Sequence, residues 1–243
     1  VKNGPSPQWV QERLKAIGLR PISALVDITN LVTFDLCRPL HVFDADKLAG
    51  DLTMRFARDG EKILALDGKE YTLEDGMNVI ADSKSVHAIG GIMGGENTGC
   101  TEETTNVFLE VALFDPIRTA TTGRKLGIES DARYRFERGL DTESTYWGAE
   151  VATRLVLAFC GGEASELTVA GEMPEWARPV SLRPERLKSF GGVDVASDEA
   201  VDILTRLGFK PKVENGVIHG TTPSWRADVE TEYCLVEEVL RVK

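Results

Sequence analysis

The sequence lacks the features that define several large classes of protein. No apolar run approaches the roughly 18 residues that a membrane-spanning helix requires, so we expect no membrane partner. The opening segment Val1–Trp9 has no basic stretch followed by an apolar one, so we expect no secretory signal and a cytoplasmic location. The chain also has no initiator Met at its start, which suggests that it is a fragment of a longer polypeptide.

Cysteine is scarce, and the common catalytic motifs are missing. The 4 cysteines lie too far apart to form a closely spaced pair of metal ligands or redox thiols, and we expect them to be reduced: Cys37, Cys100, Cys160 and Cys234. There is no Gly-x-Ser-x-Gly elbow, no His-Glu-x-x-His zinc motif and no cysteine nucleophile paired with a histidine. A hydrolase built from this sequence would therefore act through a positioned water.

Positive charge is in deficit, since 28 Lys and Arg face 39 Asp and Glu and give a formal net charge of -11. Such a balance argues against a broad surface that coats nucleic acid, because those surfaces neutralise many phosphates with Lys and Arg. A local basic patch remains between residues 117 and 138, where the net charge is positive. Its residues Arg124, Lys125 and Arg133 are our candidates for contact with a polyanion.

Apolar periodicity and turn residues predict a fold of the α+β class in two domains. A chain of 243 residues suits one domain of about 150 residues and a smaller one. Pro174, Trp176 and Pro179 read as a linker, so we expect a mixed-sheet domain at residues 1–173 and a small winged-helix-like α+β domain at 178–243.

The same patterns predict the individual elements. In the first domain we expect helices at residues 9–17, 115–126 and 142–159, and strands at 24–30, 52–56, 63–66, 71–73, 78–81, 86–89 and 107–112. In the second domain we expect a helix near 184, a helix at 197–207, a hairpin turning at 215–216 and a helix from about 228.

Three segments carry groups that could form a site. In the first, Thr29 and Asn30 stand at the end of the expected strand, and His41 follows Pro39 in an extended turn. A lone histidine is most often structural, and only its polar neighbours favour a functional role here.

The second segment, GGIMGG at residues 90–95, fits no phosphate-binding fingerprint and reads as a tight strand-to-turn passage. The third places Glu110 among apolar residues, where a carboxylate needs a partner. It is either a member of an ion pair, with one of the arginines at 133–138, or a reader of ligand hydroxyl or ammonium groups.

Six motifs resemble, in order and spacing, the beta subunit of bacterial phenylalanyl-tRNA synthetase. They are SPQWVQERLKAIGLRPISALVDITN, RPLHVFDADKL, GGIMGG, TNVFLEVA, RYRFERGLD and TPSWRADVETEYCLVEEVLR. The resemblance covers nearly the whole chain. It implies that the first domain is an editing module, which hydrolyses tyrosine mistakenly attached to tRNA(Phe). A pocket for phenylalanine cannot strongly reject an isostere with an added hydroxyl, whereas a second pocket that hydrogen-bonds the hydroxyl can discriminate by roughly 10⁴.

The resemblance also implies roles for single residues. Glu110 and the backbone of Gly90 and Gly91 match positions that read the tyrosine hydroxyl. The positions around the amino acid, the terminal adenosine and the attacking water are matched by Arg20 and by the expected catalytic residues His41, Asn30 and Thr29. Ser130 and Ala132 match the remaining wall, although the family often has Thr where Ser130 stands.

The family further carries a magnesium site of clustered carboxylates, matched here by Asp228, Glu237 and Glu238. Cys234 stands where a fourth Asp is expected, and magnesium disfavours the soft thiolate. A solvated acidic helix face is therefore the favoured interpretation of this segment. We expect no cofactor in this chain, and the resemblance assigns ATP and magnesium to the whole enzyme.

The partners that the resemblance implies are the acceptor end of tRNA(Phe), the alpha subunit in an α2β2 complex, and tyrosine or phenylalanine as small ligands. Two alternatives stay open from the sequence. One is a binding module that recognises tRNA or an amino acid without hydrolysis, and the other is a structural spacer of the synthetase.

Overall fold

The computed structural model describes residues 1–243 as two compact units, Val1–Ala170 and Gly171–Lys243. The helices of unit 1 are α1 (Gln8–Ala16), α2 (Ala24–Leu36), the short 3-10 turn η1 (Ala45–Lys47), α3 (Pro116–Leu126), α4 (Asp131–Phe136) and α5 (Ser144–Cys160). Its strands are β1 (His41–Asp44), β2 (Thr53–Phe56), β3 (Lys62–Leu64), β4 (Glu70–Thr72), β5 (Asn78–Ala81), β6 (Val86–Ile89), β7 (Met93–Gly94) and β8 (Val107–Glu110).

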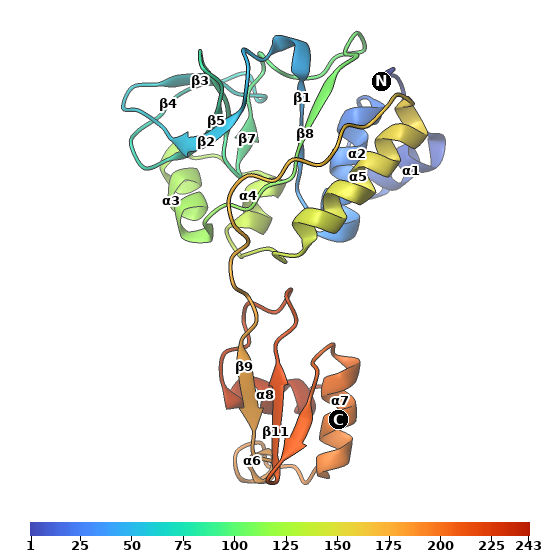
Figure 1. The fold of residues 1–243 in the computed structure, drawn as a ribbon, viewed down its shortest axis with the longest axis vertical. Coiled ribbons are helices and arrows are strands. Elements are labelled where there is room, and N and C mark those ends of the chain that lie inside the picture. Colours follow the sequence, from blue (N-terminus) through green and yellow to red (C-terminus); the bar gives the residue numbers. More distant parts are fainter. The chain divides into compact units, whose positions relative to one another are not determined.

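Strands β1 and β8 form an antiparallel ribbon in the middle of unit 1, between helices α1, α2 and α5 and the larger sheet (Figure 1). Successive side chains of a strand point to opposite faces. Val42 and Leu109, which are opposite one another, pack into an apolar cluster with α2 and α5. His41 and Glu110 therefore lie on the other face of the ribbon.

That other face meets a second apolar cluster, to which the larger sheet contributes. This sheet has the order β2-β5-β6-β7, and the β3–β4 hairpin stands beside it. Phe43 of the ribbon packs with Ile80 of β5, Ala88 of β6, Phe114 and Phe136. The ribbon is thus covered on both faces, which holds its side chains in fixed directions.

The expected strand at residues 24–30 is wrong, because this segment is the first half of α2. Its β-branched residues favour a strand, but Leu25, Ile28 and Val32 recur at helical spacing and are buried against α5. Asp27 also stabilises the helix start, where it accepts hydrogen bonds from Ser6 Oγ at 2.5 Å and Ile22 N at 2.8 Å. Thr29 and Asn30 accordingly stand in a helix and not at a strand end.

The remaining expected elements of unit 1 are present, with small shifts at their ends. Helix α3 begins after Asp115, whose side chain accepts from Arg118 N at 2.7 Å. It ends at Gly127, which has a φ of 65°. The GGIMGG segment forms the β6–β7 turn, as predicted.

Unit 2 has its own apolar core around a three-stranded antiparallel sheet with the order β10-β11-β9. Its elements are β9 (Pro179–Leu182), α6 (Glu185–Ser189), α7 (Ser197–Arg206), β10 (Lys212–Glu214), β11 (Val217–Thr221) and α8 (Glu232–Leu240). Helix α8 begins later than expected, because Asp228 belongs to the preceding loop. The predicted α+β class is confirmed, and no helix in the chain is both long and apolar enough to cross a bilayer.

Candidate functional site

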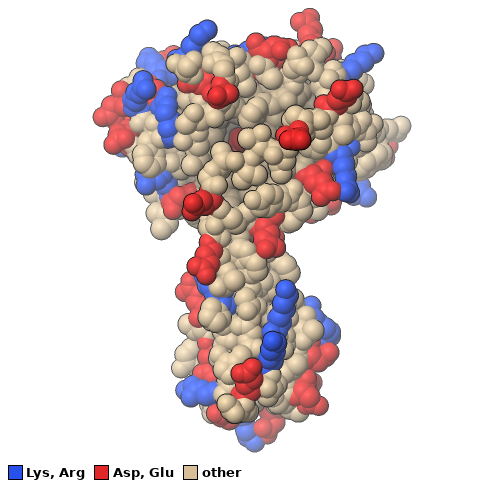
Figure 2. Space-filling model, viewed as in Figure 1, with Lys and Arg blue, Asp and Glu red and all other residues tan.

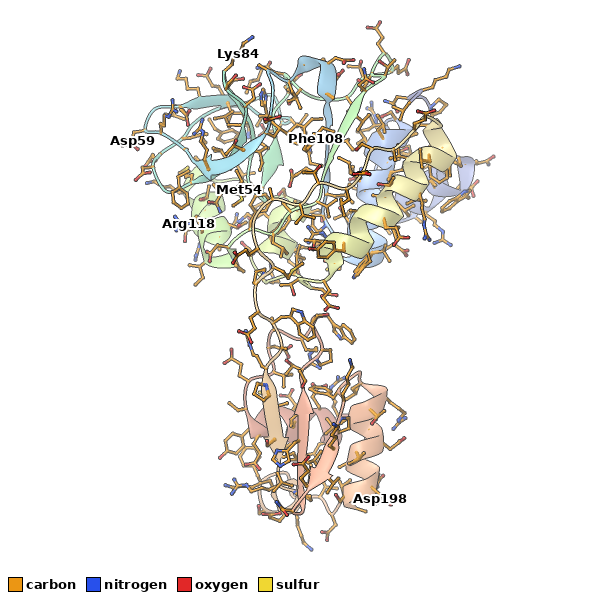
Figure 3. All side chains as sticks on the ribbon, in the orientation of Figure 1. Met54, Asp59, Lys84, Phe108, Arg118 and Asp198 are labelled. Carbon is orange, nitrogen blue, oxygen red and sulfur yellow. The ribbon has the colours of Figure 1, made fainter.

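His41 and Glu110 are directly opposite one another in the β1–β8 ribbon. Opposed residues of antiparallel strands carry their Cβ atoms about 4.5–5.5 Å apart on the same face. Phe43, on that same face, contacts the His41 ring edge-on with 4.4 Å between ring centroids. Its own cross-strand partner Phe108 is 42% exposed and lies near the middle of unit 1 in Figure 3. A basic and an acidic group therefore share one wall with aromatic rings.

The His41 ring is held against a backbone that only glycine permits. A Cβ at Gly94 of β7 would lie 2.3 Å from His41 Cε1 and 2.7 Å from Nε2. Burial lowers the pKa of His41 to about 4, so the imidazole is neutral at physiological pH. Its Nε2 is buried and has no hydrogen-bond partner in the protein. A neutral imidazole with a free nitrogen is suited to bind a water or a ligand hydroxyl.

Glu110 is partly buried, and its carboxylate accepts no hydrogen bond from the protein. Burial raises the pKa of Glu110 to about 7, against the opposing effect of the positive charge of Arg38. Of the two alternatives for Glu110, the ion pair with an arginine at 133–138 is wrong, because each of these arginines binds another carboxylate. The pairs are Arg133–Glu137 at 3.0 Å, Arg135–Asp131 at 3.2 Å and Arg138–Glu137 at 2.9 Å. The oxygens of Glu110 are thus free for a ligand.

The glycine-rich turn forms a second wall of this region. A Cβ at Gly90 would lie 2.7 Å from the Phe114 ring, and one at Gly91, whose φ is 72°, would lie 2.9 Å from it. Phe114 in turn contacts Phe136 edge-on, with ring centroids 5.0 Å apart. Ala132 packs against the same apolar cluster, which also contains Phe43.

Ser130 links this turn to helix α4. Its hydroxyl donates to Ile92 O at 2.6 Å and accepts from Arg133 N at 3.1 Å, as the N-cap of the helix. The hydroxyl oxygen keeps one acceptor position for a ligand.

Three predicted residues form no hydrogen bond or ion pair with His41 or Glu110. Thr29 Oγ1 donates to Val26 O at 2.7 Å within α2. The Asn30 side chain makes no hydrogen bond, and one turn later the Phe34 ring lies 4.5 Å from the Arg135 guanidinium of α4. Residues four apart share a helix face, so Asn30 looks toward α4. Arg20 is exposed in the loop between α1 and α2 and makes no contact with the pair.

Arg38 is a residue of this region that sequence reasoning missed. It is fully buried, and its guanidinium donates to Ala112 O and to Ser144 Oγ at 3.3 Å. Burial lowers the pKa of Arg38 to about 10, which the charges of Glu110 and Asp141 oppose. Only its position just before the Pro-Leu-His segment could have hinted at it, because nothing in the sequence marks a buried arginine.

The basic patch is partly neutralised. Lys125 pairs with Glu74, and Arg133 is 12% exposed and donates to Ile128 O at 2.6 Å in addition to Glu137. Arg124 is exposed, and its Nε donates to Ala120 O at 3.3 Å without any ion pair. Charged side chains stand mostly around the rim of unit 1 in Figure 2, and the middle of that face is largely uncharged.

The carboxylates that match the family's magnesium site are held by arginine. Arg226 binds Asp228 at 2.8 and 2.7 Å and Glu238 at 2.7 and 2.8 Å. Glu237 is exposed, and no group of His, Cys, Asp and Glu side chains is placed to hold a metal. Two of the expected donors are thus engaged by a cation of the protein itself, so the residues in this arrangement do not fit a magnesium ion.

A surface hollow of about 600 Å³ lies in unit 2 and not at the His41–Glu110 pair. Phe190 and Tyr233, whose rings are 4.6 Å apart, line it together with Cys234 and Glu237. It is an open, mainly apolar depression whose charged lining residues are Glu237 and Arg241.

Comparison with known proteins identifies the family to which the chain belongs. Residues 1–161 match the family model of the B3/4 domain, and residues 180–243 match that of the tRNA synthetase B5 domain. The chain therefore belongs to the B3/4 domain family and carries a B5 domain after the B3/4 domain.

The relatives of this chain confirm the resemblance to the beta subunit of phenylalanyl-tRNA synthetase that the motifs predicted. The chain is 57% identical to the phenylalanine–tRNA ligase beta subunit of Paramagnetospirillum magneticum and 58% identical to that of Brucella abortus. Each match covers 100% of this chain and 30% of the relative, so the chain spans about 30% of the length of the curated relatives it matches.

A looser structural likeness, with a TM-score of 0.43 and 17% identity, links the chain to an N-terminal fragment of the phenylalanyl-tRNA synthetase beta subunit from Pyrococcus horikoshii. It covers 89% of this chain and 64% of that chain.

Proposed function

We propose that this chain is part of a phenylalanine–tRNA ligase beta subunit, and that its B3/4 domain hydrolyses the ester of mischarged tyrosyl-tRNA(Phe). One observation carries the proposal: Glu110, a carboxylate without a protein donor, stands directly opposite the neutral His41 on one face of the ribbon. The confirmed family and the relatives' names support the same assignment.

Glu110 accepts the phenolic hydroxyl of tyrosine in this proposal. A hydrogen bond to an ionised acceptor is short and strong, whereas phenylalanine would leave the carboxylate desolvated and unpaired at a cost of about 1–3 kcal/mol or more. The rings of Phe43, Phe114 and Phe136 supply the apolar wall for the aromatic side chain. Gly90 and Gly91 carry no side chain, which lets the Phe114 ring pack directly against their backbone.

His41 positions the attacking water through its free Nε2. With a pKa near 4 it is a weak base, so its main contribution is orientation and acceptance of a hydrogen bond. Thr29 and Asn30 on α2, Arg20 and Ser130 complete the surroundings of the amino acid and the terminal adenosine. The reaction then needs no protein nucleophile: water adds to the ester carbonyl, and the adenosine hydroxyl leaves with a proton.

The partners follow from the same proposal. The acceptor end of tRNA(Phe) reaches the site past Arg124, Lys125 and Arg133. The alpha subunit binds elsewhere in an α2β2 complex that acts in the cytoplasm, and ATP and magnesium serve the aminoacylation carried out by the whole enzyme.

Hydrolysis of tyrosyl and phenylalanyl esters tests the proposal most directly. We expect the chain to hydrolyse tyrosyl-tRNA(Phe) faster than phenylalanyl-tRNA(Phe), and His41→Ala to slow the tyrosyl reaction by about 10²-fold or more. His219→Ala is the matched control, because His219 lies in unit 2 and binds only Ser181, at 2.8 Å. A tyrosyl ester of adenosine, used in parallel, removes the need for contact with the tRNA body. Binding of both esters without turnover would favour the non-catalytic binding module instead.

A further inference from the structure

Arg38 presents an electrostatic puzzle. It has the largest side chain among the fully buried residues, yet it forms no salt bridge. A buried charge without a contact partner is costly, and an apolar residue of similar volume is usually at least as stable. Its Nε also has no hydrogen-bond partner. Stability alone therefore does not account for a guanidinium at this place.

The position of Arg38 connects it to the ribbon face that carries His41 and Glu110. It lies between the left-handed end of α2 at Cys37 and the start of β1 at His41. Its guanidinium donates to Ala112 O, on the chain segment that leaves β8 two residues after Glu110, and to Ser144 Oγ of α5. The group also lies 5.8 Å from the centre of the Phe136 ring. Arg38 is thus fixed by the same segment that carries Glu110.

We propose that Arg38 is a positioning residue for hydroxyl recognition: its charge acts on Glu110 through space, favouring the carboxylate, while both Glu110 oxygens stay free for the ligand. This inference rests on the proposed role of Glu110 in reading tyrosine. A direct Arg38–Glu110 salt bridge would occupy the acceptor, and a distant charge would leave it protonated. The observed arrangement avoids the direct salt bridge, because Nη1 and Nη2 of Arg38 donate to Ser144 and Ala112 instead.

Few other charges act on this pair. His41 faces Glu110 from β1 and is neutral above about pH 4, so it adds no charge near neutral pH. Asp141, in the loop before α5, acts on Arg38. The pKa of Glu110 is raised by burial and lowered by Arg38 alone. Removing the positive charge should therefore shift the titration of Glu110 upward.

The first measurement follows the Glu110 carboxyl carbon by NMR as a function of pH, without any ligand. Arg38→Gln keeps an amide donor for Ala112 O but removes the charge, and we expect the midpoint to rise by about one unit. Arg38→Lys keeps the charge and should leave the midpoint within about half a unit of the parent's. An unchanged midpoint in Arg38→Gln, or equal midpoints in the Gln and Lys variants, would overturn the inference. If Arg38→Gln does not fold, the Lys variant decides, and a rise of about a full unit in it counts against the proposal.

The second measurement is binding of free tyrosine and phenylalanine to the same proteins. At pH 7 we expect the preference of Arg38→Gln for tyrosine to fall by about fivefold, because the ionised fraction of Glu110 drops from about one half to about one tenth, and to recover near pH 9 as Glu110 ionises. Equal weakening for both amino acids at every pH would show a merely structural role for Arg38. Glu110→Gln separates the two hypotheses. If it leaves the tyrosine preference intact, the proposed function of Glu110 fails, whereas the coupling of Arg38 to Glu110 is still judged by the NMR titration.

Discussion

Gly94 and His41 are packed so closely that the Cβ of any other residue at position 94 would lie 2.3 Å from the imidazole Cε1. Real Cβ contacts of this length do not occur, so either the ring or strand β7 would have to move. The orientation of His41 is therefore set by the absence of a side chain on a neighbouring strand.

Replacing Gly94 by Ala should consequently disturb activity more than folding. We expect tyrosyl-tRNA(Phe) deacylation to fall by about 10²-fold, because an error of about 1 Å in a positioned group can cost that much. Gly4→Ala is the matched control, since a Cβ there meets nothing within 4 Å. Deacylation rates and melting temperatures of the two variants would be compared. A Gly94→Ala protein with the parent's rate would remove His41 orientation from the mechanism.

Glu110 should distinguish tyrosine from phenylalanine. Glu110→Gln keeps an acceptor oxygen but removes the charge, so tyrosine should bind roughly tenfold less tightly while phenylalanine is nearly unaffected. Calorimetry with each free amino acid measures this difference. Glu103→Gln serves as a control, because Glu103 is exposed and its carboxylate binds nothing. Equal losses for the two amino acids would mean that Glu110 only supports the pocket.

Glu110 should also make stability depend on pH. Its pKa is about 7 in the folded state against a usual value of 4.5, so the folded state binds more protons between those values. Stability contributed by this group is present below the unfolded pKa and is lost as pH rises through the folded pKa. Relative to the parent, Glu110→Gln should gain up to about 3 kcal/mol between pH 4.5 and 8.

Urea unfolding of both proteins at pH 5 and pH 8 checks that gain. Burial of neutral His41 works in the opposite direction over part of the range, because its lowered pKa favours the unfolded state as pH falls from 6.5 toward 4. This effect is common to both proteins and cancels in the difference. A difference that stays constant with pH would show that Glu110 keeps an ordinary pKa in the folded state.

The exposed Arg124 is expected to contact tRNA phosphates. Arg124→Glu should weaken tRNA binding and reduce the slope of log K against log salt by about 1. Arg154→Glu is the control, because Arg154 is also exposed on unit 1 but stands on α5 and pairs with Glu150. Filter binding or anisotropy at several salt concentrations gives both slopes. Identical slopes in the parent and Arg124→Glu would make the patch an ordinary solvated surface.

In unit 2, Arg226 binds two carboxylates, and we expect it to stabilise the fold far more than an exposed ion pair does. Glu238 is 4% exposed, and Arg226 and Arg241 hold its pKa down to about 2. Arg226→Met would leave Glu238 with Arg241 alone and should cost about 2–3 kcal/mol, whereas Arg178→Met, which breaks the exposed Arg178–Glu230 pair, should cost less than about 1 kcal/mol. Denaturant unfolding gives both values, and comparable losses would contradict the assignment.

The sequence was informative wherever a local rule decided the structure. The hairpin turn at Asn215-Gly216, for example, is recognised from two residues alone. The local pattern gave the wrong prediction for helix α2. Its apolar run is also compatible with a strand, and only the burial of Leu25, Ile28 and Val32 against α5 distinguishes the two. Tertiary packing decided that element.

The candidate site divides in the same way. The motifs pointed to His41, Glu110 and Gly90–Gly91, and the structure brings the first two into register on adjacent strands. One alternative from the sequence paired Glu110 with an arginine at 133–138, yet the charge that acts on it is Arg38, more than seventy residues away in sequence. Nothing in the pattern of either segment could reveal a through-space relationship that arises only when β1 and β8 pair.

The direct pairing of His41 with Glu110 also limits how the two strands can change in length. Side chains along a strand alternate between its two faces. The insertion or loss of one residue within β8 would therefore turn Glu110 toward α2 and α5, and would bring Leu109 or Val111 to the face that carries His41. Changes of two residues would preserve the face but shift Glu110 out of line with His41. We therefore expect insertions and deletions to be tolerated in the connections outside the ribbon and not between the paired residues His41 and Glu110.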